Sequence, residues 1–428
     1  MQPRVTAENV SDTTAGFYRQ PHPRGRVALV LGAGNVASIG PLDVLYKLFV
    51  EGQVCLLKLH PVNDYLGPFF EEAFAELIAD GFLRTAYGGA DVGAYLCRHD
   101  GIDEIHITGS DRTHDAIVFG SGEEGAERKR RGQPVLRKRI ISELGNVSPV
   151  IVVPGRWSEG DLRFHAENVA SQLANNASFN CNAAKVLILH EAWPQRQALI
   201  DALRAILAEA PQRVAYYPGA AERYERFVST HPQAEAFGER RSGTLPWTLI
   251  AGVDSDDRDD LCFTTESFCG VMAQTSLVAA DTAEFLRRAV DFCNETLWGT
   301  LNACLIVDPR TAGELRQPLD DAVAALRYGS VGINHWPALS FALGCTTWGA
   351  FPGHTYEDIQ SGIGVVHNTF MFDRPQKSVV YGPFRMWPKP PWFITHRGTA
   401  KLGPKLARLE ADPRLGRLPG ILWAALRG

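Results

Sequence analysis

Apolar and polar positions along most of the chain follow two periods, and together they predict strands separated by helices. Short apolar runs predict buried strands, and apolar residues repeated every three or four positions predict helices. The strands are expected at 26–31, 53–58, 83–87, 101–110, the end of 140–153, 185–190 and 303–307, and the helices at 41–51, 68–80, 92–98, 160–176, 193–209 and 282–293. This alternation predicts right-handed βαβ units and mostly parallel sheets.

Three segments lack a clear period. Residues 119–139 form a glycine-rich, charge-dense insert in which Arg128–Arg131 are four consecutive basic residues. Such a run can grip a phosphate or a nucleic acid, but acidic residues directly precede it, so a solvated loop is favoured. The segment 212–260 is predicted to be rich in loops. The tail after Pro383 is rich in proline and tryptophan. It could cover a hydrophobic substrate entrance or contact a membrane surface, but packing on a neighbouring subunit is favoured.

Composition narrows the function classes. The chain has 428 residues, 45% of them hydrophobic and 21% charged, which is typical of a globular protein of more than one domain. A net charge of −5 gives no reason to expect nucleic acid as a partner, and no apolar run is long enough for an integral membrane segment. Eight cysteines without CxxC or zinc-ligand spacing predict reduced thiols in the cytoplasm and no metal site.

The first candidate for chemistry is a glycine turn after the first strand. Residues 32–37 read G-x-G-x-x-A between a strand and a helix, which fits either a phosphate cradle or a plain tight turn. A dinucleotide site would need an acidic residue at the end of the next strand, but that strand ends in Lys58. The lysine suits a cation beside a ribose or a phosphate.

The second candidate is Cys181, in the short polar loop 176–182 that directly precedes an apolar strand. A loop held by rigid elements can expose a sulfur and surround it with backbone N–H groups, which favours a reactive thiolate. The alternative is a buried cysteine that acts as a small hydrophobic residue.

Six short motifs, taken in order, resemble the aldehyde dehydrogenase superfamily. They are Asn35 followed by Lys58, Thr108-Gly109-Ser110, Glu143-Leu144-Gly145, Asn176-x-x-x-x-Cys181, Glu266-Ser267-Phe268-x-Gly270 and Ser361-Gly362-x-Gly364. Each motif is weak alone, but their order over most of the chain is specific.

The resemblance implies an α/β fold with two parallel-sheet lobes and a β arm for oligomerisation. It divides the chain into an N-terminal arm (1–24), a Rossmann-like cofactor lobe that is short at its N-terminus (25–142), a catalytic lobe (143–364) and an oligomerisation arm with a tail (365–428). It also implies a homodimer or a homotetramer.

The same resemblance implies NAD(P)-dependent oxidation of an aldehyde to a carboxylic acid. Cys181 would be the nucleophile, Glu143 the general base, and the side-chain amide of Asn35 a donor to the oxyanion. NAD or NADP would be held by Lys58, Glu266, Phe268, Thr108, Gly109 and Ser110.

Several departures from the family pattern keep other functions open. Only 34 residues precede Asn35, and Ser178 and Phe179 stand where the family favours glycine and glutamine. Pro61 stands where NAD-preferring members often carry glutamate, so NADP is also expected to fit. A CoA-linked acyl reductase is the nearest rival, although a water-activating Glu143 favours hydrolysis. A non-catalytic homologue that binds a nucleotide or a partner is the other.

Overall fold

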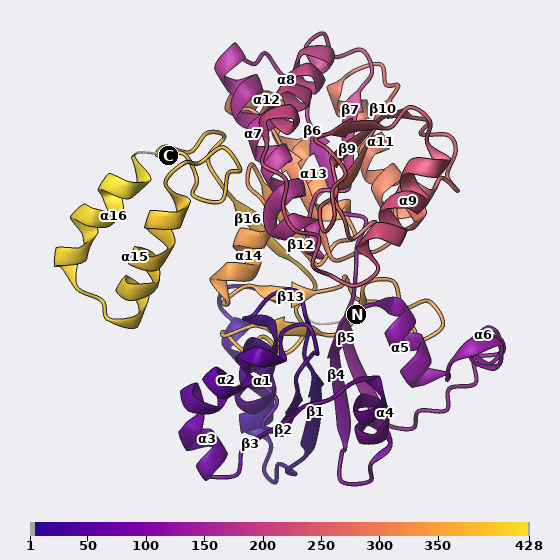
Figure 1. Cartoon of the computed structure of the whole chain (residues 1–428), viewed down its shortest axis with the longest axis vertical. Coiled ribbons are helices and arrows are strands. Elements are labelled where there is room, and N and C mark those ends of the chain that lie inside the picture. The colour runs from indigo at the N-terminus through magenta and orange to yellow at the C-terminus, as the bar shows by residue number, and fades with distance from the viewer. Residues whose placement is uncertain (1–4, 427–428) are drawn as a thin grey trace.

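Two separate β-sheets organise the chain, and the computed structural model describes residues 5–426 of it (Figure 1). The lower lobe in Figure 1 holds the six-stranded sheet and the upper lobe the eight-stranded one. The mixed α/β fold with parallel-sheet lobes is therefore confirmed. No helix within residues 5–426 is long and apolar enough to cross a membrane.

The first sheet has helices on both faces. Its order is β14 (Gly362–Ile363), β5 (Arg139–Glu143), β4 (Glu104–Thr108), β1 (Val27–Leu31), β2 (Val54–Lys58) and β3 (Leu83–Ala86), and only β14 runs antiparallel to its neighbour. Ala28 and Val30 pack on one face with α1 (Ile39–Phe49), α2 (Gly67–Ala73) and α3 (Ala75–Ala79). Leu29 packs on the other with α4 (Ala90–Arg98) and α5 (Asp111–Val118). Alternate residues of one strand thus serve two cores.

The second sheet repeats this plan on a larger scale. Its order is β16 (Ser378–Tyr381), β12 (Ser330–Ile333), β11 (Asn302–Ile306), β6 (Pro149–Val152), β7 (Val186–His190), β10 (Val271–Leu277), β9 (Trp247–Val253) and β8 (Glu235–Phe237). One core contains residues of α7 (Glu159–Ala174) and α8 (Arg196–Glu209). The opposite core contains residues of α9 (Ala220–Thr230), α10 (Leu261–Thr264), α11 (Thr282–Glu295) and α13 (Arg316–Ala325).

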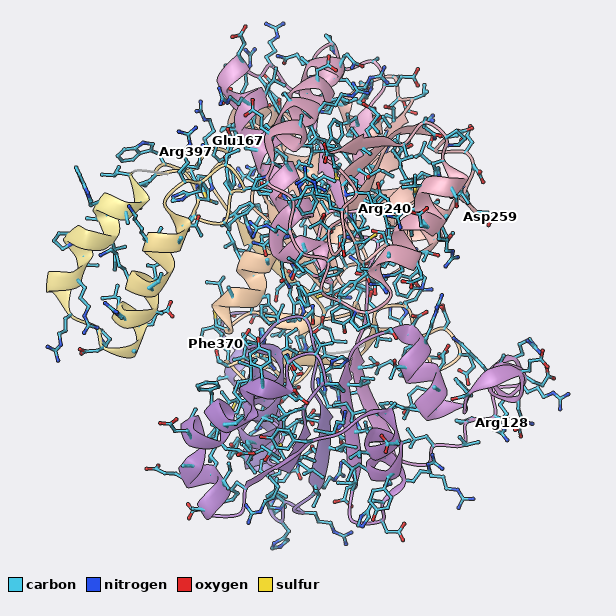
Figure 2. All side chains as sticks on the ribbon, in the orientation of Figure 1. Arg128, Glu167, Arg240, Asp259, Phe370 and Arg397 are labelled. Carbon is cyan, nitrogen blue, oxygen red and sulfur yellow. The ribbon has the colours of Figure 1, made fainter. Side chains whose placement is uncertain are left out.

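The remaining elements are short helices, a small two-stranded sheet and a C-terminal pair of helices. The helix α12 (Pro309–Glu314) precedes α13, and α14 (Ala338–Leu343) leads to a two-stranded antiparallel sheet of β13 (Thr347–Gly349) and β15 (Val365–His367). The helices α15 (Thr399–Ala411) and α16 (Leu418–Ala425) pack on each other through Leu402, Ile421 and Ala424. In Figure 1 this yellow hairpin stands apart from both lobes, and Figure 2 marks Arg397 at its base.

Three expectations about local structure were wrong. The insert 119–139 contains a helix, α6 (Gly122–Arg130), because its opposite charges pair one turn apart: Arg128 with Glu124, and Arg131 with Glu127. Figure 2 shows Arg128 on this helix, at the edge of the first lobe. The segment 212–260 contains α9, β8 and β9, and 68–80 is two helices that divide at Phe74.

The segment expected to contain an oligomerisation arm and a tail, 365–428, begins with β15, one strand of the two-stranded antiparallel sheet. Its strand β16 extends the second sheet by pairing in parallel with β12, and its last part is the helical hairpin. The motif at Ser361–Gly364 also lies elsewhere than assigned, because β14 joins the first sheet beside Glu143. Ser361 donates its hydroxyl to the Gly145 carbonyl at 2.7 Å, so this turn joins the two lobes.

Candidate active site

A deep cleft of about 1510 Å³ lies between the two lobes, and residues of both line it. One wall follows the carboxyl ends of β1, β2, β4 and β5, where parallel sheets usually bind their ligands. The other wall comes from the segments that precede β7 and β10. All the predicted site residues line this cleft: Asn35, Lys58, Thr108, Gly109, Ser110, Glu143, Cys181, Glu266 and Phe268.

The loop before Cys181 has a strained backbone. Asn176, Ala177 and Ser178 have φ values of 51°, 54° and 70°, in the left-handed region that costs a non-glycine residue about 1–2 kcal/mol. Tertiary contacts therefore hold the loop. The buried Lys185 ammonium donates to the Ser178 hydroxyl at 2.8 Å and to the Cys269 carbonyl at 3.2 Å.

The peptide of Cys181 is fixed from the second lobe. Its carbonyl accepts hydrogen bonds from the Ser148 hydroxyl at 3.1 Å and from the Asn302 amide at 3.2 Å. The residue is partly exposed, but the sulfur lies deep in the cleft. This burial, with the charges of Glu143 and Glu266, raises the pKa of the Cys181 thiol well above its usual range. A neighbouring base is therefore needed to make the thiolate.

Glu143, at the end of β5, is placed to be that base. Its side chain is buried, and its Oε1 has no hydrogen-bond partner among residues 5–426. Burial and then the charge of Asp43 raise the pKa of the carboxyl from 4.5 to about 7, while the nearby Trp348 and Cys181 side chains oppose this. A carboxyl with a pKa near 7 can both accept and return a proton at neutral pH.

Asn35 contacts the nucleophile loop directly. Its side-chain amide donates to the Phe179 carbonyl at 3.0 Å, and its backbone carbonyl accepts from Asn176 at 2.9 Å and from Tyr216 at 3.0 Å. Asn35 thus joins the first sheet to the Cys181 loop. Because an amide nitrogen carries two hydrogens, one remains for a ligand in the cleft.

Four of the residues expected to hold the cofactor lie in the first lobe. Lys58 ends β2 with 7% of its surface exposed, and burial lowers the pKa of its ammonium. Ser110 accepts from the Thr113 N–H at 3.2 Å and so caps α5. The Thr108 hydroxyl instead donates to Asp43 at 3.0 Å, and the Gly109 N–H donates to the Glu143 carbonyl. Thr108 and Gly109 therefore position the cleft wall.

Glu266 and Phe268 follow α10 and approach from the second lobe. The Glu266 carboxyl lies so close to Gly145 that a Cβ there would come within 2.2 Å of Oε2. Its Oε1 is buried without a hydrogen-bond partner in the described part of the chain. Burial raises the pKa of Glu266 to about 7, although Lys185 opposes this. Phe268, at φ 40°, packs its ring 5.7 Å from that of Phe179.

Two residues that sequence reasoning missed also shape the site. Asp43 is buried on α1, and its carboxylate lies 3.3 Å from His106 and within electrostatic reach of Glu143. Lys185 is buried directly before β7. The sequence did hold one indication of each residue, namely a charged side chain among apolar neighbours. A charge in such a position is seldom buried without a partner.

Comparisons with known proteins identify the family of this chain. The sequence model described as "Aldehyde dehydrogenase family" matches residues 5–228. Over 193 residues the chain is 28% identical to N-succinylglutamate 5-semialdehyde dehydrogenase of Sphingopyxis alaskensis, which covers 45% of this chain and 36% of that protein. Its counterpart from Hahella chejuensis is 25% identical over 390 residues, 83% of this chain and 73% of that one.

Solved structures resemble the fold. An NAD-dependent aldehyde dehydrogenase from Sinorhizobium meliloti matches with a TM-score of 0.61 and 20% identity, over 82% of this chain and 64% of that one. An NADP-dependent glyceraldehyde-3-phosphate dehydrogenase from Bacillus halodurans matches with a TM-score of 0.62 and 17% identity, over 81% and 67%. The chain spans 36–47% of the length of the first curated relatives it matches. The family model covers more than half of the sequence, and the chain belongs to the aldehyde dehydrogenase family.

Proposed function

We propose that this chain oxidises an aldehyde to a carboxylic acid with NAD or NADP, through a thioester on Cys181. The observation that carries the proposal is the pairing of a buried thiol with a buried carboxyl, Glu143, whose pKa is raised to about 7. In the overall reaction an aldehyde, water and the oxidised cofactor give the acid, the reduced cofactor and a proton.

The first step belongs to the Cys181–Glu143 pair. Glu143 takes the thiol proton, and the sulfur then attacks the carbonyl carbon. The oxygen gains the negative charge, and the free hydrogen of the Asn35 amide and the Cys181 N–H are suited to stabilise it. Donors of this kind contribute roughly 3–4 kcal/mol each to the transition state.

The cleft also suits a dinucleotide. Glu266 offers a buried acceptor oxygen without a hydrogen-bond partner among the described residues, and Lys58 offers a partly desolvated ammonium, which together suit ribose hydroxyls. Pro61 leaves no acid there to repel a 2′-phosphate, so both NAD and NADP are expected to fit. When bound, the nicotinamide would supply the hydride acceptor for the carbon attached to Cys181. Glu143 passes the thiol proton to solvent and, as a carboxylate again, takes a proton from the water that releases the acid.

The test is turnover by the purified full chain. NAD and NADP are each supplied with a panel of aldehydes that includes N-succinylglutamate 5-semialdehyde and benzaldehyde, with and without CoA. Cofactor reduction and acid formation are expected without CoA, and Cys181→Ala should abolish both. Cys345→Ala is the matched control, because Cys345 is the other partly exposed cysteine and does not line the cleft.

Three other results would each contradict the proposal. Turnover that survives Cys181→Ala would remove the nucleophile assignment, and strict dependence on CoA would make the chain an acyl reductase of the same fold. If neither cofactor raises the melting temperature and no aldehyde is oxidised, the chain is a non-catalytic member of the family.

A further inference from the structure

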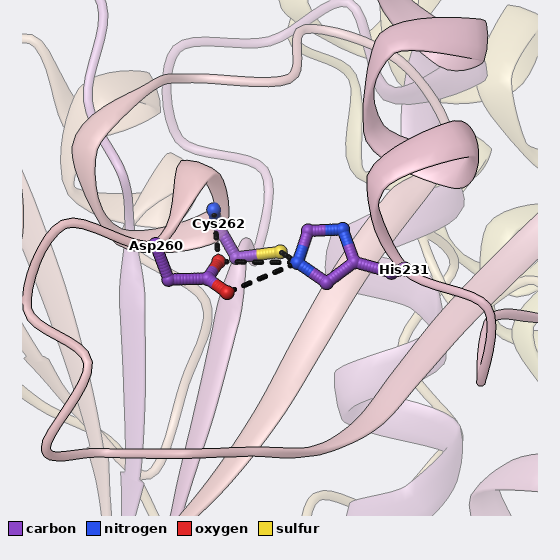
Figure 3. Close-up of side chains that lie close together, drawn as sticks. All are labelled: His231, Asp260 and Cys262. Carbon is purple, nitrogen blue, oxygen red and sulfur yellow. Dashed lines mark hydrogen bonds and ion pairs between the residues drawn. The ribbon is translucent and has the colours of Figure 1, made fainter.

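Three metal-ligating side chains meet outside the cleft, where α9 ends and α10 begins (Figure 3). His231 directly follows α9, Asp260 is the N-cap residue of α10, and Cys262 lies in its first turn. Their ligand atoms all lie within 4.8 Å of one another. His231 and Cys262 are buried and Asp260 is partly exposed, so the cluster lies just below the surface.

The separations suit one tetrahedral ion. The His231 Nε2 lies 3.1 Å and 3.2 Å from the two Asp260 carboxylate oxygens and 3.6 Å from the Cys262 sulfur. With zinc bonds of about 2.0–2.1 Å to nitrogen and oxygen and about 2.3 Å to sulfur, the edges of a tetrahedral site are about 3.3 Å for N–O and about 3.6 Å for N–S. The distances from the His231 Nε2 to the Asp260 oxygens and to the Cys262 sulfur are thus close to those of a tetrahedral zinc site.

The other side of the imidazole fixes its orientation. Its Nδ1 lies 2.7 Å from the Phe227 carbonyl, to which it donates its hydrogen. This is the outer contact that most zinc-bound histidines make, and it leaves the Nε2 lone pair of the neutral ring directed at the carboxylate and the sulfur. Three electron-pair donors therefore lie within 4.8 Å of one another, and a cation placed between them would stabilise them.

We propose that His231, Asp260 and Cys262 bind a Zn²⁺ ion, with water at the fourth position. Binding converts the Cys262 thiol to a thiolate and releases its proton to solvent. Nitrogen, sulfur and carboxylate oxygen are the donors that zinc prefers. The sequence spacing predicted no metal site, because 29 residues separate His231 from Asp260 and only the fold brings them together.

The site would brace one wall of the cleft. Phe227 of α9 and Thr264 of α10 both line it, and the chain continues from α10 directly to Glu266. An ion held by the ends of both helices joins them at a point outside the cleft. Zinc is therefore expected to raise the melting temperature by several degrees, with or without nucleotide.

The test uses the full chain, stripped of metal and titrated with Co²⁺ and then Zn²⁺. One Co²⁺ per chain is expected, with a near-ultraviolet sulfur-to-cobalt charge-transfer band that Zn²⁺ abolishes. Cys262→Ser should lose the band, and His231→Gln should weaken Zn²⁺ binding by more than about tenfold, since even outer-contact changes cost about that much. Far-ultraviolet circular dichroism checks that both variants fold.

Two control variants separate this site from the other thiols. Cys345→Ser and Cys181→Ala should keep the full band, because neither residue belongs to the cluster. A band that disappears with Cys181→Ala would place the ion at the cleft and overturn the proposal. No stoichiometric Co²⁺ or Zn²⁺ binding at micromolar metal would also overturn it, and the cluster would then be a buried His231–Asp260 ion pair.

Discussion

Replacing the buried Glu143 carboxyl with an amide, Glu143→Gln, is expected to stabilise the fold increasingly as the pH rises. Burial and Asp43 raise the folded pKa of this carboxyl from 4.5 to about 7. Between these values the folded chain holds a proton that the unfolded chain has lost, so the free energy of unfolding falls as the pH rises. At about 1.36 kcal/mol per pKa unit, the full cost above pH 7 is about 3 kcal/mol, and glutamine removes it.

The assay is urea unfolding of both proteins at about pH 5 and about pH 8. Roughly 0.8 kcal/mol of the cost is already present at the lower pH, so the advantage of the variant should grow by about 2.5 kcal/mol between the two. Any cost of an unpaired amide N–H is the same at both values and cancels. Glu72→Gln, at an exposed position on α2, should show no such growth. An advantage of Glu143→Gln that does not change with pH would refute the reasoning.

Two changes in the walls of the cleft and one in the loop before Cys181 give further tests. Gly145→Ala should displace the Glu266 carboxyl and weaken nucleotide binding, measured by calorimetry. Gly313→Ala on α12 is the control and should bind nucleotide normally, because its Cβ would meet nothing within 4 Å and Gly313 does not line the cleft. Lys58→Met should weaken nucleotide binding by about 10–100-fold, because it removes a charged hydrogen bond of about 1.5–3 kcal/mol, and unchanged affinity would remove Lys58 from the site. Ala177→Gly should leave the free energy of unfolding within about 1 kcal/mol of that of the natural chain. Glycine relieves the backbone strain at φ 54° in the folded chain, and this offsets the greater flexibility that it gives the unfolded chain. A larger loss of stability would contradict the strained loop.

The position of the cleft followed from the order of motifs along the chain. Lys58 and Thr108 were each predicted to lie at the end of a strand, and the carboxyl ends of parallel strands meet at one edge of a sheet. Glu143 was predicted only to lie in a turn before a strand, whereas the structure places it at the end of β5. Short-range pattern was enough for Lys58 and Thr108, because each is placed by a strand that the sequence predicted. The roles of these residues stay predictions until the variants are measured.

Other features depended on contacts between distant segments. The role of Asp43 depends on His106 and Thr108, which lie more than sixty residues away in the sequence. The cluster of His231, Asp260 and Cys262 is likewise invisible to any spacing rule. The helix α6 was missed for a different reason, because its glycines indicated a loop while its charge pairs stabilise a helix.

The proposed reaction gives a physical reason for the burial of Glu143, whose pKa that burial raises. The charges of Glu143 and Glu266 both raise the pKa of the Cys181 thiol, and the charge of Glu266 also raises that of Glu143, so each negative charge makes the next ionisation harder. In the proposed first step Glu143 takes the thiol proton, so one charge moves from oxygen to sulfur and no second charge is added to a poorly solvated space. A solvated carboxylate with an ordinary pKa would be too weak a base for this transfer. In the proposed reaction, the burial that lowers stability at neutral pH is therefore the property that would let Glu143 accept the proton.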